Sequence, residues 1–120
     1  MFKKLLSCLF VLFVVSGCDA SKKTDADIQN DKIYFFYYEK CVYCHQALDY
    51  IKKKYPNLTY EYVDVYQEDG FKLFEKCGNK FNLGRNIGTP LFCMGDKHIM
   101  GWSDISAQKF DEYVKPFLKK

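Results

Sequence analysis

The chain has 120 residues, of which 48% are hydrophobic, 18% aromatic and 28% charged, and its formal net charge is +3. This length accommodates a single domain, and the apolar content is sufficient for a packed core. The small charge, carried by dispersed basic residues, argues against a nucleic-acid-binding protein.

The N-terminus has the pattern of a signal peptide that covers residues 1–17. A positively charged start, Met1–Lys4, precedes an apolar run from Leu5 to Val15. The run is too short to cross a bilayer, because a membrane-spanning helix needs roughly 20 apolar residues. We therefore expect a segment that directs export and is then removed.

A cysteine stands directly after this segment. The sequence Val15-Ser16-Gly17-Cys18 resembles the lipobox of bacterial lipoproteins, which implies that Cys18 is acylated and becomes the mature N-terminus. Asp19 then resembles the inner-membrane retention signal of Gram-negative lipoproteins. The alternative is an ordinary cleaved signal peptide followed by an incidental cysteine.

The next stretch, residues 18–31, is polar and has Ile28 as its one large apolar side chain. It cannot bury enough surface to fold, so we expect a flexible tether. Together with the leader, it predicts a domain, residues 32–120, anchored to the inner membrane of the cell envelope. The domain would face the periplasm in a Gram-negative organism, a compartment in which disulfides persist.

Residues 33 to 48 join a strand pattern to a pair of cysteines. Ile33 to Tyr38 is apolar or aromatic throughout, as in a central strand that is covered on both faces. Cys41-Val42-Tyr43-Cys44-His45 follows, and from Cys44 the apolar residues recur at helical spacing until Pro56. The sequence therefore predicts a reactive pair of cysteines on a strand-to-helix turn.

The two cysteines of this pair are expected to differ in reactivity. Disulfide exchange needs a thiolate, and an ordinary cysteine with a pKa near 8.5 is only about 3% ionised at neutral pH. Cys41 is expected at the N-terminus of the helix, where free N–H groups and the helix dipole favour an anion, and Lys40 adds positive charge. Cys41 is therefore the predicted attacking thiol and Cys44 the resolving thiol.

A second strand and helix follow. Leu58 to Tyr66 alternates and is rich in β-branched and aromatic residues, so we expect a strand that follows the first through a right-handed parallel crossover. Residues 69–81 are expected to be helical, and residues 82–89 to form a loop.

The C-terminal part begins at Pro90. It predicts two short antiparallel strands, Leu91–Met94 and Lys97–Met100, and a final helix capped by Ser103 or Ser106. The side chains expected on the core face of this helix are Ile105, Phe110, Tyr113 or Val114, and Phe117.

The resulting order, β-α-β-α-β-β-α, resembles the thioredoxin fold in its glutaredoxin-sized form, an α/β fold with a four-stranded mixed sheet flanked by helices. Three motifs carry the resemblance: Cys41–Cys44, Gly88-Thr89-Pro90 before the third strand, and Gly101-Trp102-Ser103-Asp104 before the last helix. The resemblance implies a thiol–disulfide oxidoreductase without metal or cofactor. The cysteine motif and Gly-Thr-Pro also look like the catalytic domain of periplasmic disulfide isomerases.

The same resemblance implies roles for individual residues. The Thr89–Pro90 bond is expected to be cis and to lie beside the dithiol, with Thr89 offering its backbone to substrate. Tyr43, Ser103 and Asp104 correspond to positions that help hold glutathione in glutaredoxins. The implied partners are glutathione, protein thiols or disulfides, or a membrane electron donor or acceptor. Four positions depart from the glutaredoxin pattern: Val42, Thr89, Trp102 and Ile105.

Other interpretations of the cysteine motif stay open at this point. In a c-type haem protein the two cysteines attach haem, His45 is an axial ligand, and the sixth ligand is Met94, Met100 or His98. The strand patterns on both sides of the motif argue against this interpretation. A redox-inert adaptor with the same fold is a further alternative.

A structural zinc site is disfavoured, because it needs four ligands and the motif has few ligands in its company. Cys77 and Cys93 are either buried apolar residues or partners in a structural disulfide, and the sequence does not decide between the two.

Overall fold

The computed structural model describes residues 27–118; the leader and the predicted lipidation site Cys18 lie outside the described residues. Four strands form one mixed sheet in the order β2-β1-β3-β4, with β1 and β2 parallel and the other neighbours antiparallel. The strands are β1 (Ile33–Tyr37), β2 (Glu61–Asp64), β3 (Leu91–Met94) and β4 (Lys97–Met100).

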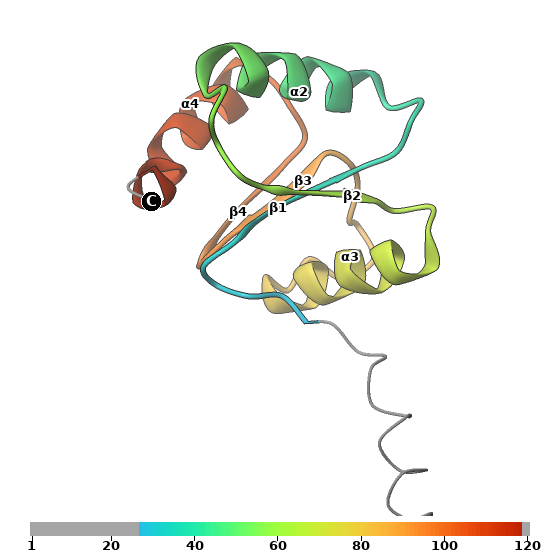
Figure 1. The fold of residues 1–120 in the computed structure, drawn as a ribbon. Coiled ribbons are helices and arrows are strands. Elements are labelled where there is room, and N and C mark those ends of the chain that lie inside the picture. Colours follow the sequence, from blue (N-terminus) through green and yellow to red (C-terminus); the bar gives the residue numbers. More distant parts are fainter. Residues whose placement is uncertain (1–26, 119–120) are drawn as a thin grey trace, which may run out of the picture.

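The helices form two layers around this sheet. They are α2 (Val42–Lys54), α3 (Glu68–Lys80), α4 (Asp104–Tyr113) and a short 3-10 helix, η2 (Lys115–Phe117). Helices α2 and α4 cover one face of the sheet and α3 covers the other (Figure 1). The predicted α/β fold and its element order are therefore confirmed.

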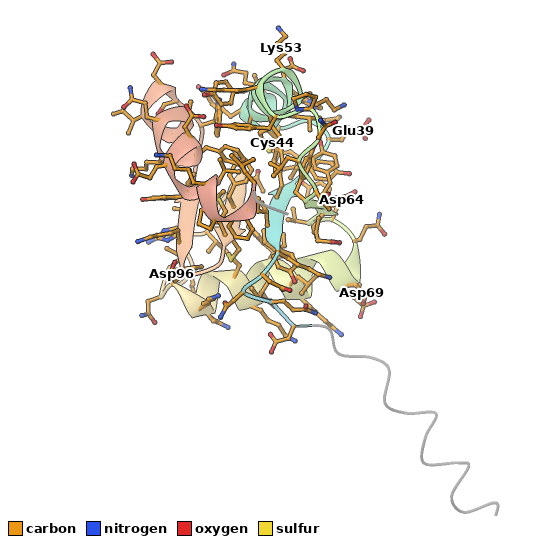
Figure 2. All side chains as sticks on the ribbon, turned by 60° about the vertical axis from the view of Figure 1, so that its left-hand side comes forward. Glu39, Cys44, Lys53, Asp64, Asp69 and Asp96 are labelled. Carbon is orange, nitrogen blue, oxygen red and sulfur yellow. A yellow bond between two sulfur atoms is a disulfide. The ribbon has the colours of Figure 1, made fainter. Side chains whose placement is uncertain are left out.

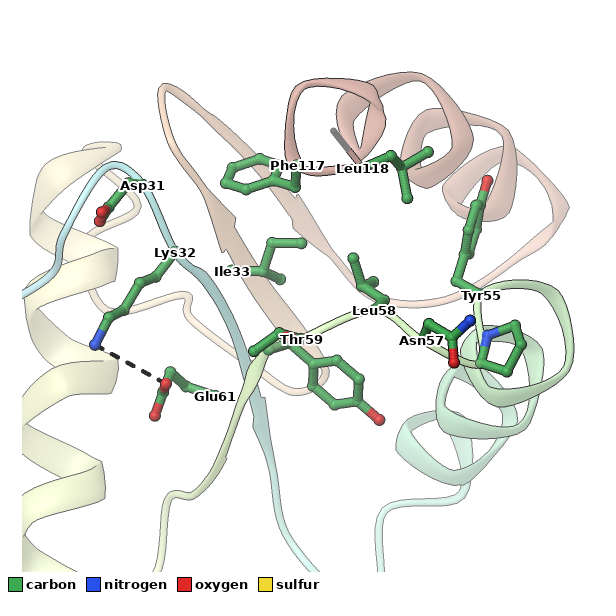
Figure 3. Close-up of a pocket in the computed structure, with 12 residues that line it drawn as sticks. Asp31, Lys32, Ile33, Tyr55, Asn57, Leu58, Thr59, Glu61, Phe117 and Leu118 are labelled. Carbon is green, nitrogen blue, oxygen red and sulfur yellow. Dashed lines mark ion pairs between the residues drawn. The ribbon is translucent and has the colours of Figure 1, made fainter. Parts of the chain in front are cut away.

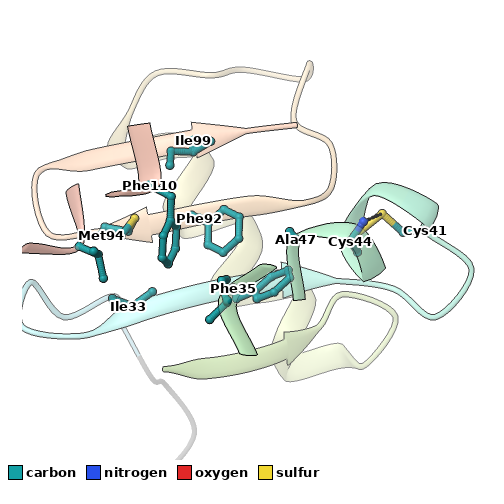
Figure 4. Packing of buried hydrophobic residues seen from close by; sticks show 11 residues of the cluster. Ile33, Phe35, Cys41, Cys44, Ala47, Phe92, Met94, Ile99 and Phe110 are labelled. Carbon is teal, nitrogen blue, oxygen red and sulfur yellow. Dashed lines mark hydrogen bonds between the residues drawn. A yellow bond between two sulfur atoms is a disulfide. The ribbon is translucent and has the colours of Figure 1, made fainter. Parts of the chain in front are cut away.

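Strand β1 lies at the centre of the core. Ile33 and Phe35 face α2 and α4, whereas Tyr34 and Phe36 face α3, and all four side chains are buried. Figure 4 shows the α2 side of this core, where Phe35 packs on Phe92 with ring centroids 4.5 Å apart. Burying a side chain of this size stabilises the fold by about 1.5–3 kcal/mol, so β1 rigidly supports the turn that follows it.

Helix α3 is held against the sheet by a close approach and a covalent bond. A Cβ at Gly70 would lie 2.1 Å from the Asp64 carbonyl oxygen, so only glycine fits there. Cys77 of α3 and Cys93 of β3 form a disulfide, and both are buried. The pairing that the sequence left open is thus present, on the face of the sheet opposite α2.

Two sequence expectations differ from the structure. Strand β2 covers Glu61–Asp64 rather than Leu58 to Tyr66, because its pairing with β1 runs only from Tyr34 to Tyr37. Ile105 was expected in the core but is 64% exposed. It lies in the first turn of α4, and the buried face of that helix is set by Phe110 instead.

The described N-terminal residues contact the domain. Ile28 packs against the α3 side of the core, and the backbone N–H of Gln29 donates to the hydroxyl of Tyr34 at 3.0 Å. Lys80 bonds Asn30 and the Gly95 carbonyl oxygen. Packing against the domain therefore already starts within the predicted tether. Between residues 27 and 118, every helix is too short or too polar to span a membrane.

Candidate active site

The predicted dithiol lies at the turn between β1 and α2. The N–H of Cys41 donates to the Tyr38 carbonyl at 3.1 Å, which fixes the turn after β1. Cys41 is the N-cap of α2, and Cys44 lies in the first helical turn. Their Cα atoms are 5.2 Å apart and their sulfurs form a disulfide, seen at the edge of the core in Figure 4. The spacing of two residues thus brings both sulfurs together, as the motif predicts.

The two sulfurs have different surroundings. The Sγ of Cys41 accepts the backbone N–H of Cys44 at 3.1 Å and the hydroxyl of Thr89 at 3.4 Å. Cys41 retains 6% exposure, whereas Cys44 is fully buried. A thiolate on Cys41 would be stabilised by these two donors and by the N-terminal end of the helix. The geometry therefore favours Cys41 as the attacking sulfur and Cys44 as the internal one.

Thr89 and Pro90 lie where the sequence predicts. Their peptide bond is cis, and Pro90 is buried. The Pro90 carbonyl accepts the N–H of Gly101 at 2.8 Å, which connects this loop to the end of β4. The segments before β3 and after β4 are thereby held next to the dithiol.

His45 has a contact that the sequence analysis missed. Its Nε2 lies 2.6 Å from the carbonyl oxygen of Glu39, to which it donates, so the ring fastens the turn that precedes Cys41. Its position four residues after the start of the motif was the only signal. His45 is exposed and acts here through the backbone, not on the sulfurs.

The remaining predicted site residues are less closely engaged. Tyr43 is 57% exposed on the first turn of α2. Ser103 is the N-cap of α4 and accepts the N–H of Ser106 at 3.3 Å, so its hydroxyl has a structural partner. Asp104 is exposed in the first turn of α4. Their part in holding substrate stays a prediction.

The candidate haem ligands do not converge. The His45 ring is engaged with Glu39, and Met94 is buried at the end of β3 far from the dithiol. The Met100 sulfur accepts the N–H of Gly88 at 3.3 Å. Within residues 27–118, moreover, no cluster of three or more His, Cys, Asp or Glu side chains is placed to hold a metal ion. His45, Met94 and Met100 are thus engaged in other contacts or placed apart from the cysteine pair.

Hydrogen bonds between partly exposed side chains connect α2 to α4. The carboxylate of Asp111 accepts the hydroxyls of Tyr50 and Tyr55 at 2.8 and 2.7 Å and the ammonium of Lys54 at 2.9 Å. Burial raises the pKa of Asp111, but these three donors outweigh it and the net pKa lies below the ordinary value. Burial and then the hydrogen bond to Asp111 raise the pKa of Tyr55 to about 12. The network thus connects the C-terminal end of α2 to α4.

A cavity is found elsewhere in the described part of the chain. It has a volume of about 650 Å³ and is found at the start of β1, the end of the sheet opposite the dithiol (Figure 3). Ile33, Leu58 and Phe117 line it, and an ion pair between Lys32 and Glu61 at 4.0 Å closes one side. No cysteine lines this cavity, so we assign the active site to the dithiol.

The described chain is similar to solved glutaredoxin structures. The glutaredoxin from Archaeoglobus fulgidus aligns with a TM-score of 0.53 at 20% identity, covering 69% of this chain and 85% of that one. The buckwheat glutaredoxin, solved in complex with glutathione, aligns with a TM-score of 0.50 at 20% identity, covering 72% and 76%. No protein-family model and no curated protein matches the chain. At this identity the similarity establishes a glutaredoxin-like fold.

Proposed function

We propose that this chain is a thiol–disulfide oxidoreductase in which Cys41 attacks and Cys44 resolves. The observation that carries the proposal is the pair of donors on the Cys41 sulfur, from Cys44 N–H and the Thr89 hydroxyl, beside a fully buried Cys44. Such an arrangement stabilises one thiolate and keeps the second sulfur within reach of it.

The reaction runs through a mixed disulfide. A partner thiolate attacks the Sγ of Cys41, the bond to Cys44 breaks, and Cys44 leaves as a thiolate. A second partner thiolate attacks the partner sulfur of the mixed disulfide and releases Cys41. One partner disulfide forms, two electrons enter the cysteine pair, and the protons lost by the partner thiols balance those gained by the pair. The reverse sequence reduces a partner disulfide.

The thiol partner is proposed to be glutathione or a protein. The buckwheat neighbour is a glutaredoxin–glutathione complex, which supports a thiol of this kind. Tyr43, Thr89, Ser103 and Asp104 are the residues proposed to contact it, since the fold brings their segments to the dithiol.

We place this activity in the cell envelope, on a lipid anchor at Cys18. The apolar leader and its lipobox-like end support an exported lipoprotein. The buried disulfide between Cys77 and Cys93 adds independent support, since such bonds persist in oxidising compartments.

A single-turnover experiment tests the proposed activity. The reduced protein is mixed with hydroxyethyl disulfide, a small neutral disulfide, and the loss of protein thiols is followed. We expect rapid oxidation that Cys41→Ser abolishes and that the double variant Cys77→Ala/Cys93→Ala retains. A rate that Cys41→Ser leaves unchanged would overturn the proposal, and a Soret band in the isolated protein would point to haem instead.

A further inference from the structure

Four segments meet around the dithiol because of the sheet topology. Strands β1, β2 and β4 end, and strand β3 begins, at the same end of the sheet. Figure 1 shows this end of the sheet at the right-hand side, where the N-terminus of α2 lies. We call this region the dithiol end; its segments are residues 38–45, 64–71, 84–90 and 100–105.

The dithiol end carries most of the exposed apolar side chains. Of the large apolar residues exposed within residues 27–118, only Tyr62 and Leu118 lie elsewhere. The others are between 42% and 77% exposed. We define them as the apolar rim: Val42, Tyr43, Tyr66, Phe71, Met100 and Ile105.

Contacts connect the rim to the reactive sulfur from both sides. On one side, Tyr66 stacks on Tyr38 with ring centroids 5.2 Å apart, and the Tyr38 carbonyl bonds the N–H of Cys41. On the other side, Met100 bonds the N–H of Gly88, which directly precedes the threonine that donates to the Cys41 sulfur. Tyr66 and Met100 are therefore linked to the dithiol turn, and Val42 and Tyr43 lie between its two cysteines. Phe71 and Ile105 extend the rim along the first turns of α3 and α4.

The dithiol end is also acidic. Its four segments contain five acidic and two basic residues. The acidic ones are Glu39, Asp64, Glu68, Asp69 and Asp104, and the basic ones are Lys40 and Arg85. Figure 2 shows Glu39, Asp64 and Asp69 along one side of the molecule. A surface of this sign attracts cationic partners and repels anionic ones.

We propose that the partner of the dithiol is a polypeptide segment whose cysteine is flanked by apolar and basic residues, and that the apolar rim is its docking surface. This inference rests on the proposed function and specifies its substrate class. Exposed apolar patches mark interaction sites, and this patch lies next to Cys41, whose sulfur can form a covalent bond with a partner cysteine. Glutathione fits less well, because it has two carboxylates and no large apolar side chain. A surface of anionic lipids is repelled by the same acidic residues.

The test compares substrates on the full-length protein. Mixed disulfides are prepared from apolar-basic, apolar-acidic and polar-basic short peptides, and their kcat/KM values are measured beside those of glutathione disulfide and hydroxyethyl disulfide. We expect kcat/KM for the apolar-basic peptide to exceed that for glutathione disulfide by about tenfold or more. For the apolar-acidic peptide, we expect a clearly smaller advantage over glutathione disulfide.

Variants locate the surface. The double variant Tyr66→Ser/Ile105→Ser should lower kcat/KM for the apolar-basic peptide by about three- to tenfold and leave hydroxyethyl disulfide unchanged. Leu118→Ser, an exposed apolar residue at the opposite end, is the matched control and should change neither.

The outcomes separate the two proposals. If hydroxyethyl disulfide is not turned over through Cys41, the proposed function itself fails. If it is turned over but glutathione disulfide matches the apolar-basic peptide, or the two apolar peptides react equally, or the double variant reacts like the control, then the docking inference is overturned.

Discussion

The hydroxyl of Thr89 is predicted to set the reactivity of Cys41. Its Oγ1 lies 3.4 Å from the Cys41 sulfur and donates to it. Hydrogen bonds to charged groups contribute about 1.5–3 kcal/mol, and because this one is long we take about 1 kcal/mol. Removing it by Thr89→Val should lower the thiolate fraction at a given pH below the titration midpoint about fivefold.

The assay is alkylation of the reduced protein by iodoacetamide as a function of pH, with the site of modification read by mass spectrometry. Thr89→Val should move the midpoint of the Cys41 rate profile upward by about 0.7 pH units. Thr89→Ser keeps the hydroxyl and should follow the wild type. Superimposed profiles for Thr89→Val and the wild type would refute the role that we assign to this hydroxyl.

Two further predictions concern the scaffold. The pKa of Asp111 is lower in the folded protein than its ordinary value of 3.8. The stability that the ionised carboxylate contributes is therefore fully present above pH 3.8 and is lost as the pH falls through the pKa of the folded protein. Asp111→Asn should therefore lower the free energy of unfolding by about 1 kcal/mol at neutral pH, after allowance for partial exposure. In the variant, the urea midpoint should fall less steeply as the pH is lowered, whereas Asp96→Asn, at an exposed position, should behave like the wild type. An unchanged pH dependence of the midpoint in Asp111→Asn would contradict this prediction. Replacing Cys77 and Cys93 by alanine should lower the free energy of unfolding by about 3 kcal/mol while thiol exchange persists, and an unshifted denaturant midpoint would count against the buried disulfide.

The central part of the fold was predictable from local pattern. β1 is apolar on both faces because both faces are covered, and the short strands β3 and β4 are separated by a two-residue Gly-Asp turn with strong local preference. The dithiol followed from its position between a strand and a helix. Each of these patterns lies within a few neighbouring residues, so a single sequence is sufficient to predict the corresponding element.

Features that depend on tertiary contact were not predictable in the same way. To predict the pairing of Cys77 with Cys93, one would need to know that their Cα atoms, one in a helix and one in a strand, lie 6.2 Å apart. Ile105 is apolar, yet the buried positions of α4 are Ser106 and Phe110, four residues apart, and Ile105 lies off the face that they define. The link between His45 and the Glu39 carbonyl joins a side chain to a backbone atom, which leaves no mark in residue type.

The most direct test of the assigned roles is capture of the reaction intermediate. Cys44→Ser removes the resolving sulfur, so the full chain should accumulate mixed disulfides with its thiol partner, linked through Cys41 and reversed by dithiothreitol. Peptide mapping of these adducts should find Cys41, and Cys41→Ser/Cys44→Ser should form none. Adducts through Cys77 or Cys93, or equal capture by the double variant, would contradict the account.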